Sequence, residues 1–384
     1  MRPRTLNQTG WRARPDVSLL IITILLTVIG FLMILSASAP AAQVQLKDSM
    51  FFFKKQVIWG ALGAVALAVG MALPLDRIRS YAKPTLFVSG ILMLLVHVPH
   101  VGMTVYGATR WIKLGPITLQ PSELAKLALV LFVADFLARH PDKGWTLVKE
   151  YRQILLPVAG TLGLVLFQPD LGTTLVCALA CYVLFWLNGT AGWRMGLLAL
   201  MGSAAVMAHS LTTPYQRLRW LAFMDPWKYP KDIGFQLIQS LLAIGSGGVF
   251  GTGWGQGKQK LFYLPIQHAD FIFAVLAEEL GLIGSISLIA LFLLFAQRGF
   301  AIAKRSQNPF HQMIVIGLTT IICAQAFVNI GVVSASLPTT GIPLPFLSAG
   351  GTSLCITLFS VGIILNVSRQ SQVQLRLLKQ GERA

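Results

Sequence analysis

Long apolar runs alternate with short polar segments along almost the whole chain. A helix that crosses the hydrocarbon core of a bilayer needs about 20 mostly apolar residues, and ten runs reach that length once flanking residues are counted. They are Val17–Ser38, Val57–Leu73, Pro84–Val98, Leu124–Leu137, Ile154–Phe167, Leu171–Leu187, Met195–Met207, Phe271–Phe295, Met313–Ala335 and Leu344–Val367. The pattern predicts an all-α integral membrane protein of about ten transmembrane helices, with a long external loop between the seventh and eighth.

The basic residues orient these spans. With the N-terminus in the cytoplasm, 19 of the 31 Lys and Arg residues fall inside, 11 fall outside and Lys126 lies within a span. An excess of positive charge on the cytoplasmic side is typical of membrane proteins. We therefore expect cytoplasmic N- and C-terminal segments (1–16 and 368–384) on a single polytopic domain that covers residues 1–384.

The segment 211–270 is long for a connection between two spans. Phe235–Ile244 has the pattern of an amphipathic or re-entrant helix, and Gly245–Gly257 is a glycine-rich bend. Six basic residues outnumber three acids in this segment, which suits an anionic partner at the outer membrane surface. We expect 211–270 to be an external catalytic loop.

The composition agrees with a membrane protein. Hydrophobic residues make up 55% of the chain and charged residues 12%, about half the share that soluble domains carry. This balance excludes a disordered chain, and the separation of basic residues into short clusters argues against nucleic-acid binding. Four cysteines, Cys177, Cys181, Cys323 and Cys355, lie inside apolar runs, and we expect them to be packing residues.

Ionisable residues inside membrane spans are costly and by default indicate a functional site. Glu123 and Lys126 are three residues apart on a predicted helix, so they share a face and can pair. Pro121 and Ser122 mark the start of that helix, with Ser122 as its N-cap. The pair either neutralises itself near the outer interface, or Lys126 lends its charge to a cavity that holds an anionic head group.

Asp270 lies at the outer mouth of the eighth span, with Glu278 about two turns deeper. An Asp at a helix N-terminus is ordinarily a cap. The alternative is a proton acceptor, because an apolar wall of Phe271 and Phe273 raises the pKa of a carboxylate while nearby cations lower it. The sequence leaves both roles open for Asp270.

Two polar turns interrupt the apolar pattern. Asp170, in the turn between the fifth and sixth spans, is explained by an Asx cap. The stretch 337–353 holds three prolines and three glycines at membrane depth. Broken backbone is tolerated there only when it is buried in protein or lines a cavity, so we expect an external crevice between spans nine and ten.

Several strings, taken together and in order, resemble the SEDS family (shape, elongation, division and sporulation). They are Ala108–Ile112 with Gln120–Lys126, Phe167–Thr173, Asp225–Trp227, Gly234–Ser240, Tyr263–Pro265 with His268–Phe273, and the stretch that ends in Gly350–Ser353. The chain is more similar to the division members than to the elongation members at Gln259–Pro265. It departs from the family pattern at Ala269, where Thr is usual, and at Ala349, where Tyr is usual.

The resemblance implies a peptidoglycan glycosyltransferase that polymerises lipid II into glycan strands at the division septum of the bacterial inner membrane. Asp270 would be the catalytic general base of an inverting transfer. The substrate-binding candidates are Arg110, Glu123, Lys126, Lys258, Lys260, His268 and Ser348.

The same resemblance implies partners and a cofactor. The partners would be lipid II, an undecaprenyl-pyrophosphate-linked glycan, a class B penicillin-binding protein with transpeptidase activity, and other divisome membrane proteins. A divalent cation, Mg²⁺ or Mn²⁺, is the candidate cofactor, with no metal ligands assigned. A lipid II flippase, an elongation-type polymerase and a non-catalytic scaffold for the transpeptidase are the alternatives.

Overall fold

A bundle of long helices makes up most of the protein in the computed structural model, which describes residues 14–105, 108–115, 117–140, 148–230, 234–258 and 269–381. The elements in chain order are α1 (Val17–Leu46), α2 (Phe51–Ala72), α3 (Leu75–Ser80), α4 (Ala82–Leu95), β1 (Gly102–Val105), β2 (Ala108–Leu114), β3 (Ile117–Leu119), α5 (Pro121–Arg139), α6 (Val148–Phe167), α7 (Leu171–Leu187), α8 (Gly192–Thr212), α9 (Pro214–Met224), the 3₁₀ helix η2 (Pro226–Lys228), α10 (Phe235–Gly247), α11 (Ile272–Arg305), α12 (Pro309–Val333) and α13 (Gly351–Gly381).

Every apolar run expected to span the membrane overlaps one of these helices, and α7 has the predicted bounds. Six helices of the described chain are long and apolar enough to cross a membrane: α1, α2, α8, α11, α12 and α13. The all-α membrane fold is thus confirmed, whereas the count of ten crossing helices stays a prediction.

Two local predictions were wrong. The last span does not begin at Leu344, because residues 344–350 are not helical and α13 starts at Gly351. Ser122 is not the N-cap of α5; Gln120 holds that position and Pro121 follows at N1. Proline fits there because its missing N–H would have no helical partner.

Side-chain caps fix the starts of several other helices. Asp16 accepts from the N–H of Leu19 at the start of α1, and Asn308 accepts from the N–H of Phe310 at the start of α12. Such caps satisfy backbone donors that a helix end leaves without acceptors. Cap residues placed at the polar boundaries of apolar runs therefore set where these spans begin.

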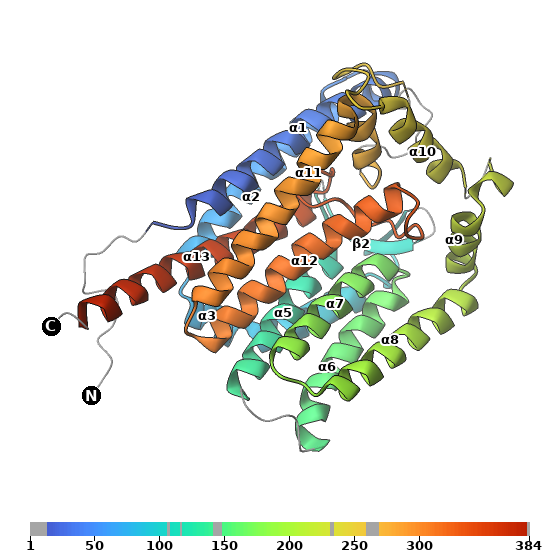
Figure 1. The fold of residues 1–384 in the computed structure, drawn as a ribbon. Coiled ribbons are helices and arrows are strands. Elements are labelled where there is room, and N and C mark those ends of the chain that lie inside the picture. Colours follow the sequence, from blue (N-terminus) through green and yellow to red (C-terminus); the bar gives the residue numbers. More distant parts are fainter. Residues whose placement is uncertain are drawn as a thin grey trace.

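Figure 1 shows the long helices lying side by side, with α12 among α11, α5 and α7, and α8 at one edge. Helix α2 packs along α13, and α1 packs against α2 and α11. Helix α1 begins and α13 ends at the same end of the bundle. This is the arrangement that an even number of crossings produces.

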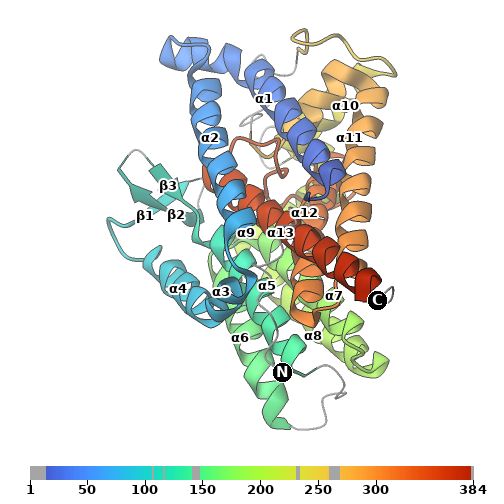
Figure 2. The same ribbon diagram turned by 90° about the vertical axis from the view of Figure 1, so that its left-hand side faces the viewer.

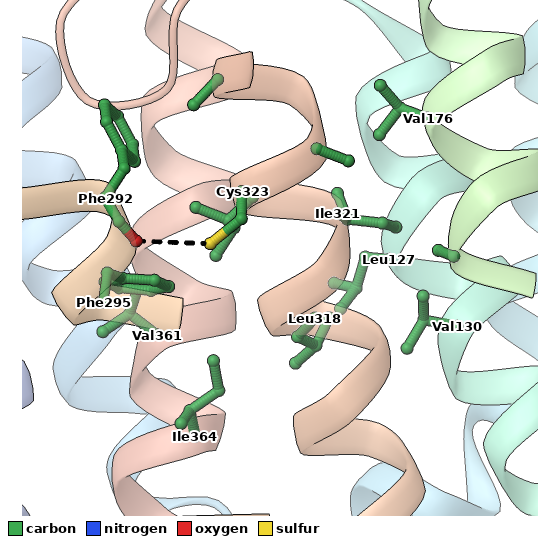
Figure 3. Packing of buried hydrophobic residues seen from close by; sticks show 14 of the residues in the cluster. Leu127, Val130, Val176, Phe292, Phe295, Leu318, Ile321, Cys323, Val361 and Ile364 are labelled. Carbon is green, nitrogen blue, oxygen red and sulfur yellow. Dashed lines mark hydrogen bonds between the residues drawn. The ribbon is translucent and has the colours of Figure 1, made fainter. Parts of the chain in front are cut away.

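The hydrophobic core lies where α5, α7, α11, α12 and α13 meet (Figure 3). Phe292 and Phe295 of α11 are fully buried there, and the Phe292 carbonyl accepts from the Cys323 thiol at 3.8 Å. All four cysteines are free thiols and three are buried. Cys177, Cys181 and Cys323 belong to the hydrophobic core, which confirms their predicted role as packing residues, whereas Cys355 is half-buried.

A small antiparallel sheet, absent from the sequence prediction, follows α4. Its order is β1-β2-β3, and Ile112 of the central strand β2 pairs with Gly102 of β1 and with Leu119 of β3. It stands out at one side of the bundle in Figure 2. The sheet leads directly into α5 and places Arg110 of β2 in the protein interior, where 5% of its surface is exposed.

Helix α11 is interrupted at Gly281, whose φ of 65° and ψ of −161° suit only glycine. Backbone groups of the glycine-rich segment 247–253 form hydrogen bonds with residues on both sides of the break. The N–H groups of Thr252 and Gly253 donate to the carbonyls of Glu278 and Glu279 at 2.9 and 3.1 Å. The carbonyls of Gly248 and Val249 accept from residues 282 and 283 at 2.9 and 3.2 Å. The break therefore leaves these four backbone groups satisfied.

Candidate functional site

A cavity of about 350 Å³ opens among α2, β2, α9, α10, the residues before α11 and the proline-glycine stretch before α13. The prolines and glycines of 337–353 predicted a crevice between spans nine and ten; the cavity borders this stretch and the start of α13, but no described residue of α12 lines it. The polar and charged residues of its lining are Lys55, Gln56, Arg110, Thr118, Gln120, Arg219, Gln236, Asp270, Thr352 and Ser353. Asp270 is the single carboxylate among the described lining residues, and three cationic side chains accompany it.

Backbone hydrogen bonds from two directions hold Asp270 in the cavity wall. The Asn329 amide of α12 donates to the carbonyls of Asp270 and Ile342, both at 2.8 Å. The Ser348 hydroxyl donates to the Ala269 carbonyl at 2.5 Å and accepts from the N–H of Leu344 at 2.8 Å. Helix α12 and the proline-glycine stretch thus fix the position of Asp270 without using its carboxylate.

Asp270 does not cap α11. The N-cap residue is Phe271, and it makes no side-chain cap hydrogen bond. Of the two roles that the sequence left open, the structure contradicts the cap and leaves the carboxylate at the cavity wall.

Arg219 of α9 is a neighbour of this carboxylate. Gly341 has a φ of 73°, and a Cβ placed there would lie 3.5 Å from Oδ2 of Asp270 and 3.6 Å from Nη2 of Arg219. The two groups therefore share the small space that this glycine leaves open. Arg219 is anchored to the same stretch, because its Nη1 donates to the Thr339 carbonyl at 3.1 Å.

Arg110 reaches the cavity from the sheet and is held by the turn before α7. Its Nε donates to the Gln168 carbonyl at 3.1 Å, and its Nη2 donates to the Pro169 carbonyl. Its Nη1 lies 3.9 Å from Oδ1 of Asp170. Asp170 also accepts from the N–H of Thr173 at 3.1 Å, so the predicted Asx cap is confirmed. The same carboxylate orients Arg110.

The environment of Asp270 changes its acidity in two opposing ways. Burial raises the pKa of Asp270 above its ordinary value, while the positive charges of Arg219 and Arg110 lower it and the negative charge of Asp170 raises it. Burial is the largest influence, so the net pKa is raised. A carboxylate with a raised pKa is a better proton acceptor than an exposed one.

The structure does not bring Glu123 and Lys126 to this cavity. Lys126 Nζ donates to Glu123 at 2.8 Å and to Gln325 Oε1 at 2.5 Å, and these residues line a separate space of about 20 Å³. Gln325 in turn donates to the Pro343 carbonyl at 2.9 Å. The pair is therefore connected to the proline-glycine stretch, and its predicted part in substrate binding stays a prediction.

The remaining candidates lie elsewhere or outside the described residues. Lys258 is exposed and does not line the cavity; its N–H donates to the buried Glu278 at 2.6 Å. Ser348 acts on the backbone beside Asp270, as given above. Lys260 and His268 fall in 259–268, outside the described residues.

Sequence reasoning did not assign most of the polar cavity residues to the site, among them Lys55, Gln56 and Arg219. Lys55 follows Lys54 near the start of α2, on the side predicted to be external, where the charge bias of membrane proteins favours few cations. The positive charge of Lys54 and Lys55 on a side where few cations are expected was the sequence signal that could have identified Lys55. Gln56 and Arg219 carried no comparable signal, since their relation to Asp270 depends on the tertiary fold.

The described lining offers little to a resident divalent cation. Mg²⁺ and Mn²⁺ bind several oxygen ligands, commonly carboxylates together with substrate phosphates. Here one carboxylate is accompanied by three cationic side chains. These residues do not by themselves fit a metal site.

Comparisons with known proteins agree with this architecture. Residues 16–373 match the family model FTSW_RODA_SPOVE, described as "Cell cycle protein". The chain is 40% identical over 355 residues to a probable peptidoglycan glycosyltransferase FtsW of Geobacter metallireducens, which covers 92% of this chain and 95% of that protein. It is 39% identical over 368 residues to the stage V sporulation protein E of Bacillus subtilis, over 95% of this chain and all of that protein.

Two solved structures are similar over nearly their whole length. One is described as "Structural coordination of polymerization and crosslinking by a peptidoglycan synthase complex"; it has a TM-score of 0.76 and 32% identity, and the match covers 93% of this chain and 98% of that chain. The other is the rod shape determining protein RodA of Thermus thermophilus, with a TM-score of 0.70, 28% identity, and coverage of 95% and 98%.

Proposed function

The chain belongs to the FtsW/RodA/SpoVE (SEDS) family of cell cycle proteins, and from this premise we propose how its cavity works. It is a multi-pass membrane protein and a peptidoglycan glycosyltransferase of the FtsW type, which acts in cell division. In our proposal the Asp270 cavity is its active site and lipid II is its substrate.

The reaction joins two lipid-linked sugars. The 4-hydroxyl oxygen of a GlcNAc in lipid II forms a bond to C1 of the growing strand's terminal MurNAc. The bond from that C1 to the oxygen of undecaprenyl pyrophosphate breaks, and the pyrophosphate leaves with the electron pair. A single displacement of this kind inverts the configuration at C1. It requires a base for the hydroxyl proton and positive charge for the departing pyrophosphate.

The cavity offers both requirements. Asp270 accepts the proton and later releases it to solvent. Arg219, which shares the space at Gly341 with Asp270, and Arg110 of β2 stabilise the leaving pyrophosphate. Backbone anchoring of Asp270 by Asn329 and Ser348 keeps the base in place during the transfer, so no reorganisation is needed when charge develops. The observation that carries the proposal is the meeting of one carboxylate with these two guanidinium groups in one cavity.

A carboxylate-to-amide change tests the base. Purified Asp270→Asn is expected to fold and insert as the wild type does but to make no glycan strands from labelled lipid II in the presence of a class B penicillin-binding protein. Asp48→Asn is the matched control, because Asp48 lies in the connection between α1 and α2, pairs with Lys54 at 2.9 Å and is outside the cavity. Strand synthesis by Asp270→Asn at the wild-type rate would refute the assignment.

Partners, location and cofactor complete the proposal. Similarity to a synthase complex supports a penicillin-binding protein as partner and a glycan as substrate. We add a class B transpeptidase, other divisome membrane proteins, a septal location and cytoplasmic termini. A divalent cation would depend on pyrophosphate oxygens as well as Asp270, because the described lining holds no other carboxylate. Chelation of divalent cations during the strand-synthesis assay tests this dependence.

A further inference from the structure

Helix α13 begins in the wall of the active-site cavity. Gly350, Gly351, Thr352 and Ser353 all line the cavity. The N–H of Leu354 donates to the Gly350 carbonyl at 2.9 Å, which closes the first turn. The N–H groups that precede it have no acceptor within the helix. An N-terminus of this kind attracts anions through its N–H groups and through the helix dipole.

The residue before α13 is Gly350, which has no side chain that could accept from these N–H groups. The Thr352 hydroxyl is turned to the sheet, where it donates to the Thr118 carbonyl at 2.9 Å. Gly351 lies under the indole of Trp59, and a Cβ there would come within 2.0 Å of a ring atom. The two glycines therefore let the ring and a ligand approach the backbone closely.

A second observation on α2 points to a ligand at the same place. Phe52, Lys55, Gln56 and Trp59 follow helical spacing on one face of α2, and all four line the cavity. Gln56 is 3% exposed, and its Nε2 has no hydrogen-bond partner among the described residues. Leaving a buried donor unsatisfied is unfavourable. An acceptor oxygen supplied by a ligand would satisfy it.

The chemistry of this wall selects an anion with several oxygens that is joined to a lipid. Helix N–H groups, the Gln56 amide and the Lys55 ammonium are all donors, and together they match a diphosphate. Just beyond them α2 exposes Val57, Ile58, Leu62, Val65 and Val69 on its outer face. A polyprenyl chain attached to a diphosphate at this point could pass along α2 into the bilayer.

The proposed reaction involves two diphosphates. The one that leaves is bonded to the C1 under attack, on the face of that carbon opposite the 4-hydroxyl, and the proposed function places it at Arg219 and Arg110. The acceptor keeps its own diphosphate, which is separated from the attacking 4-hydroxyl by the length of a disaccharide. We propose that the N-terminus of α13, with Lys55 and Gln56, is the subsite for the diphosphate of the acceptor lipid. This assignment rests on the proposed function.

Counting bound lipid tests the subsite without relying on catalysis. The full-length protein in detergent is titrated with radiolabelled undecaprenyl pyrophosphate, and we expect two equivalents to bind. Gly350→Asp places a carboxylate at the N-cap, where it accepts from the helix N–H groups and repels the diphosphate. The nearest side-chain atom to a Cβ at Gly350 is 3.6 Å away, so the substitution fits. We expect one equivalent to bind to this variant, and its melting temperature to be unchanged or higher.

A second pair of variants keeps the test independent of the glycine. Lys55→Ala should weaken binding of one equivalent at least tenfold, whereas Lys54→Ala, next to it but outside the cavity, should not. Inorganic pyrophosphate should compete poorly with the lipid. Two equivalents bound at wild-type affinity by Gly350→Asp and by Lys55→Ala would overturn the subsite, and equal competition by inorganic pyrophosphate would overturn the lipid-linked ligand.

Failure of the proposed function would look different. A wild-type protein that binds two equivalents, loses one in Gly350→Asp, and yet makes no strands from lipid II would contradict the glycosyltransferase mechanism while supporting a diphosphate subsite. A protein that makes strands but binds its two equivalents regardless of Gly350 and Lys55 would overturn the subsite alone.

Discussion

Replacement of Arg219 by Gln should shift the pH dependence of strand synthesis. Asp270 acts as a base only when it is deprotonated, so the rate rises with pH through its pKa. Burial raises the pKa of Asp270, and the charges of Arg219 and Arg110 oppose that rise. Without the positive charge of Arg219, the pKa of Asp270 should rise further above its ordinary value. The midpoint on the acid side of the profile should therefore move to higher pH in Arg219→Gln.

The geometry at Gly341 sets the size of this effect. Oδ2 of Asp270 and Nη2 of Arg219 lie within 3.5 and 3.6 Å of one point, so the two atoms are at most about 7 Å apart. At that distance the attraction is about 0.6 kcal/mol with the dielectric constant of water and about 2.4 kcal/mol with an effective value of about 20. Loss of the charge then strengthens proton binding about threefold to fiftyfold.

The assay is the initial rate of strand synthesis from labelled lipid II across the pH range in which each variant stays folded. The absolute rate of Arg219→Gln is expected to fall as well, because Arg219 also faces the leaving pyrophosphate. Arg217→Gln is the matched control, since Arg217 is an exposed residue two positions away on α9. An acid-side midpoint in Arg219→Gln that equals or lies below that of the control would refute the reasoning.

Substitutions at three further positions, 281, 135 and 170, test the scaffold and the orientation of Arg110. Gly281→Ala should lower stability by about 1–3 kcal/mol, because φ is 65° there; Gly160→Ala, where a Cβ meets nothing within 4 Å, should not lower the melting temperature. Nε of Arg79 lies 2.6 Å from the buried Asp135 carboxylate, and Asp135→Ala removes this ion pair. The variant should lose about 1–3 kcal/mol of stability; a melting temperature equal to that of the wild type would contradict this. Asp170→Asn should keep the cap of α7 and the melting temperature but slow strand synthesis, whereas Asp170→Ala should also lose about 1 kcal/mol of stability; equal rates in Asp170→Asn and the wild type would argue against its role in orienting Arg110.

The helices could be predicted from the sequence because hydropathy reports directly on burial in lipid. Leu171–Leu187 has the same bounds in the prediction and in the structure, since Asp170 caps its start and apolar residues fill it. Leu344 was assigned to a span although the helix starts only at Gly351. Hydropathy counts apolar residues of an irregular buried segment as if they were helical, so this boundary was lost.

The composition of the cavity could be predicted only in part. Asp270 was identified as an ionisable residue at the mouth of a predicted span, and the family resemblance gave Asp270 and Arg110 their predicted roles. The sheet was missed because β1 and β3 have four and three residues, too few to show a period. Lys55 and Arg219 are far apart in the chain and meet only when α2 and α9 fold around the same space. Glu123 and Lys126 were expected either to neutralise one another or to lend charge to a head-group cavity; they bond to one another and to Gln325 in a space separate from the Asp270 cavity, and their part in substrate binding stays a prediction.

The break in α11 lets a glycine-rich segment contact the helical turns behind Asp270. Residues 272–280 follow Asp270 and Phe271, and at their far end the carbonyls of Glu278 and Glu279 accept from Thr252 and Gly253. The close approach requires glycine, because a Cβ at Gly251 would lie 2.1 Å from the Glu279 carbonyl oxygen. Gly247 and Gly251 therefore serve contact between backbones, whereas a Cβ at Gly248 would meet nothing within 4 Å. The short helical segment behind Asp270 is braced by segment 247–253 at one end, and Asn329 donates to the Asp270 carbonyl at the other, so this segment and Asp270 are positioned as one unit.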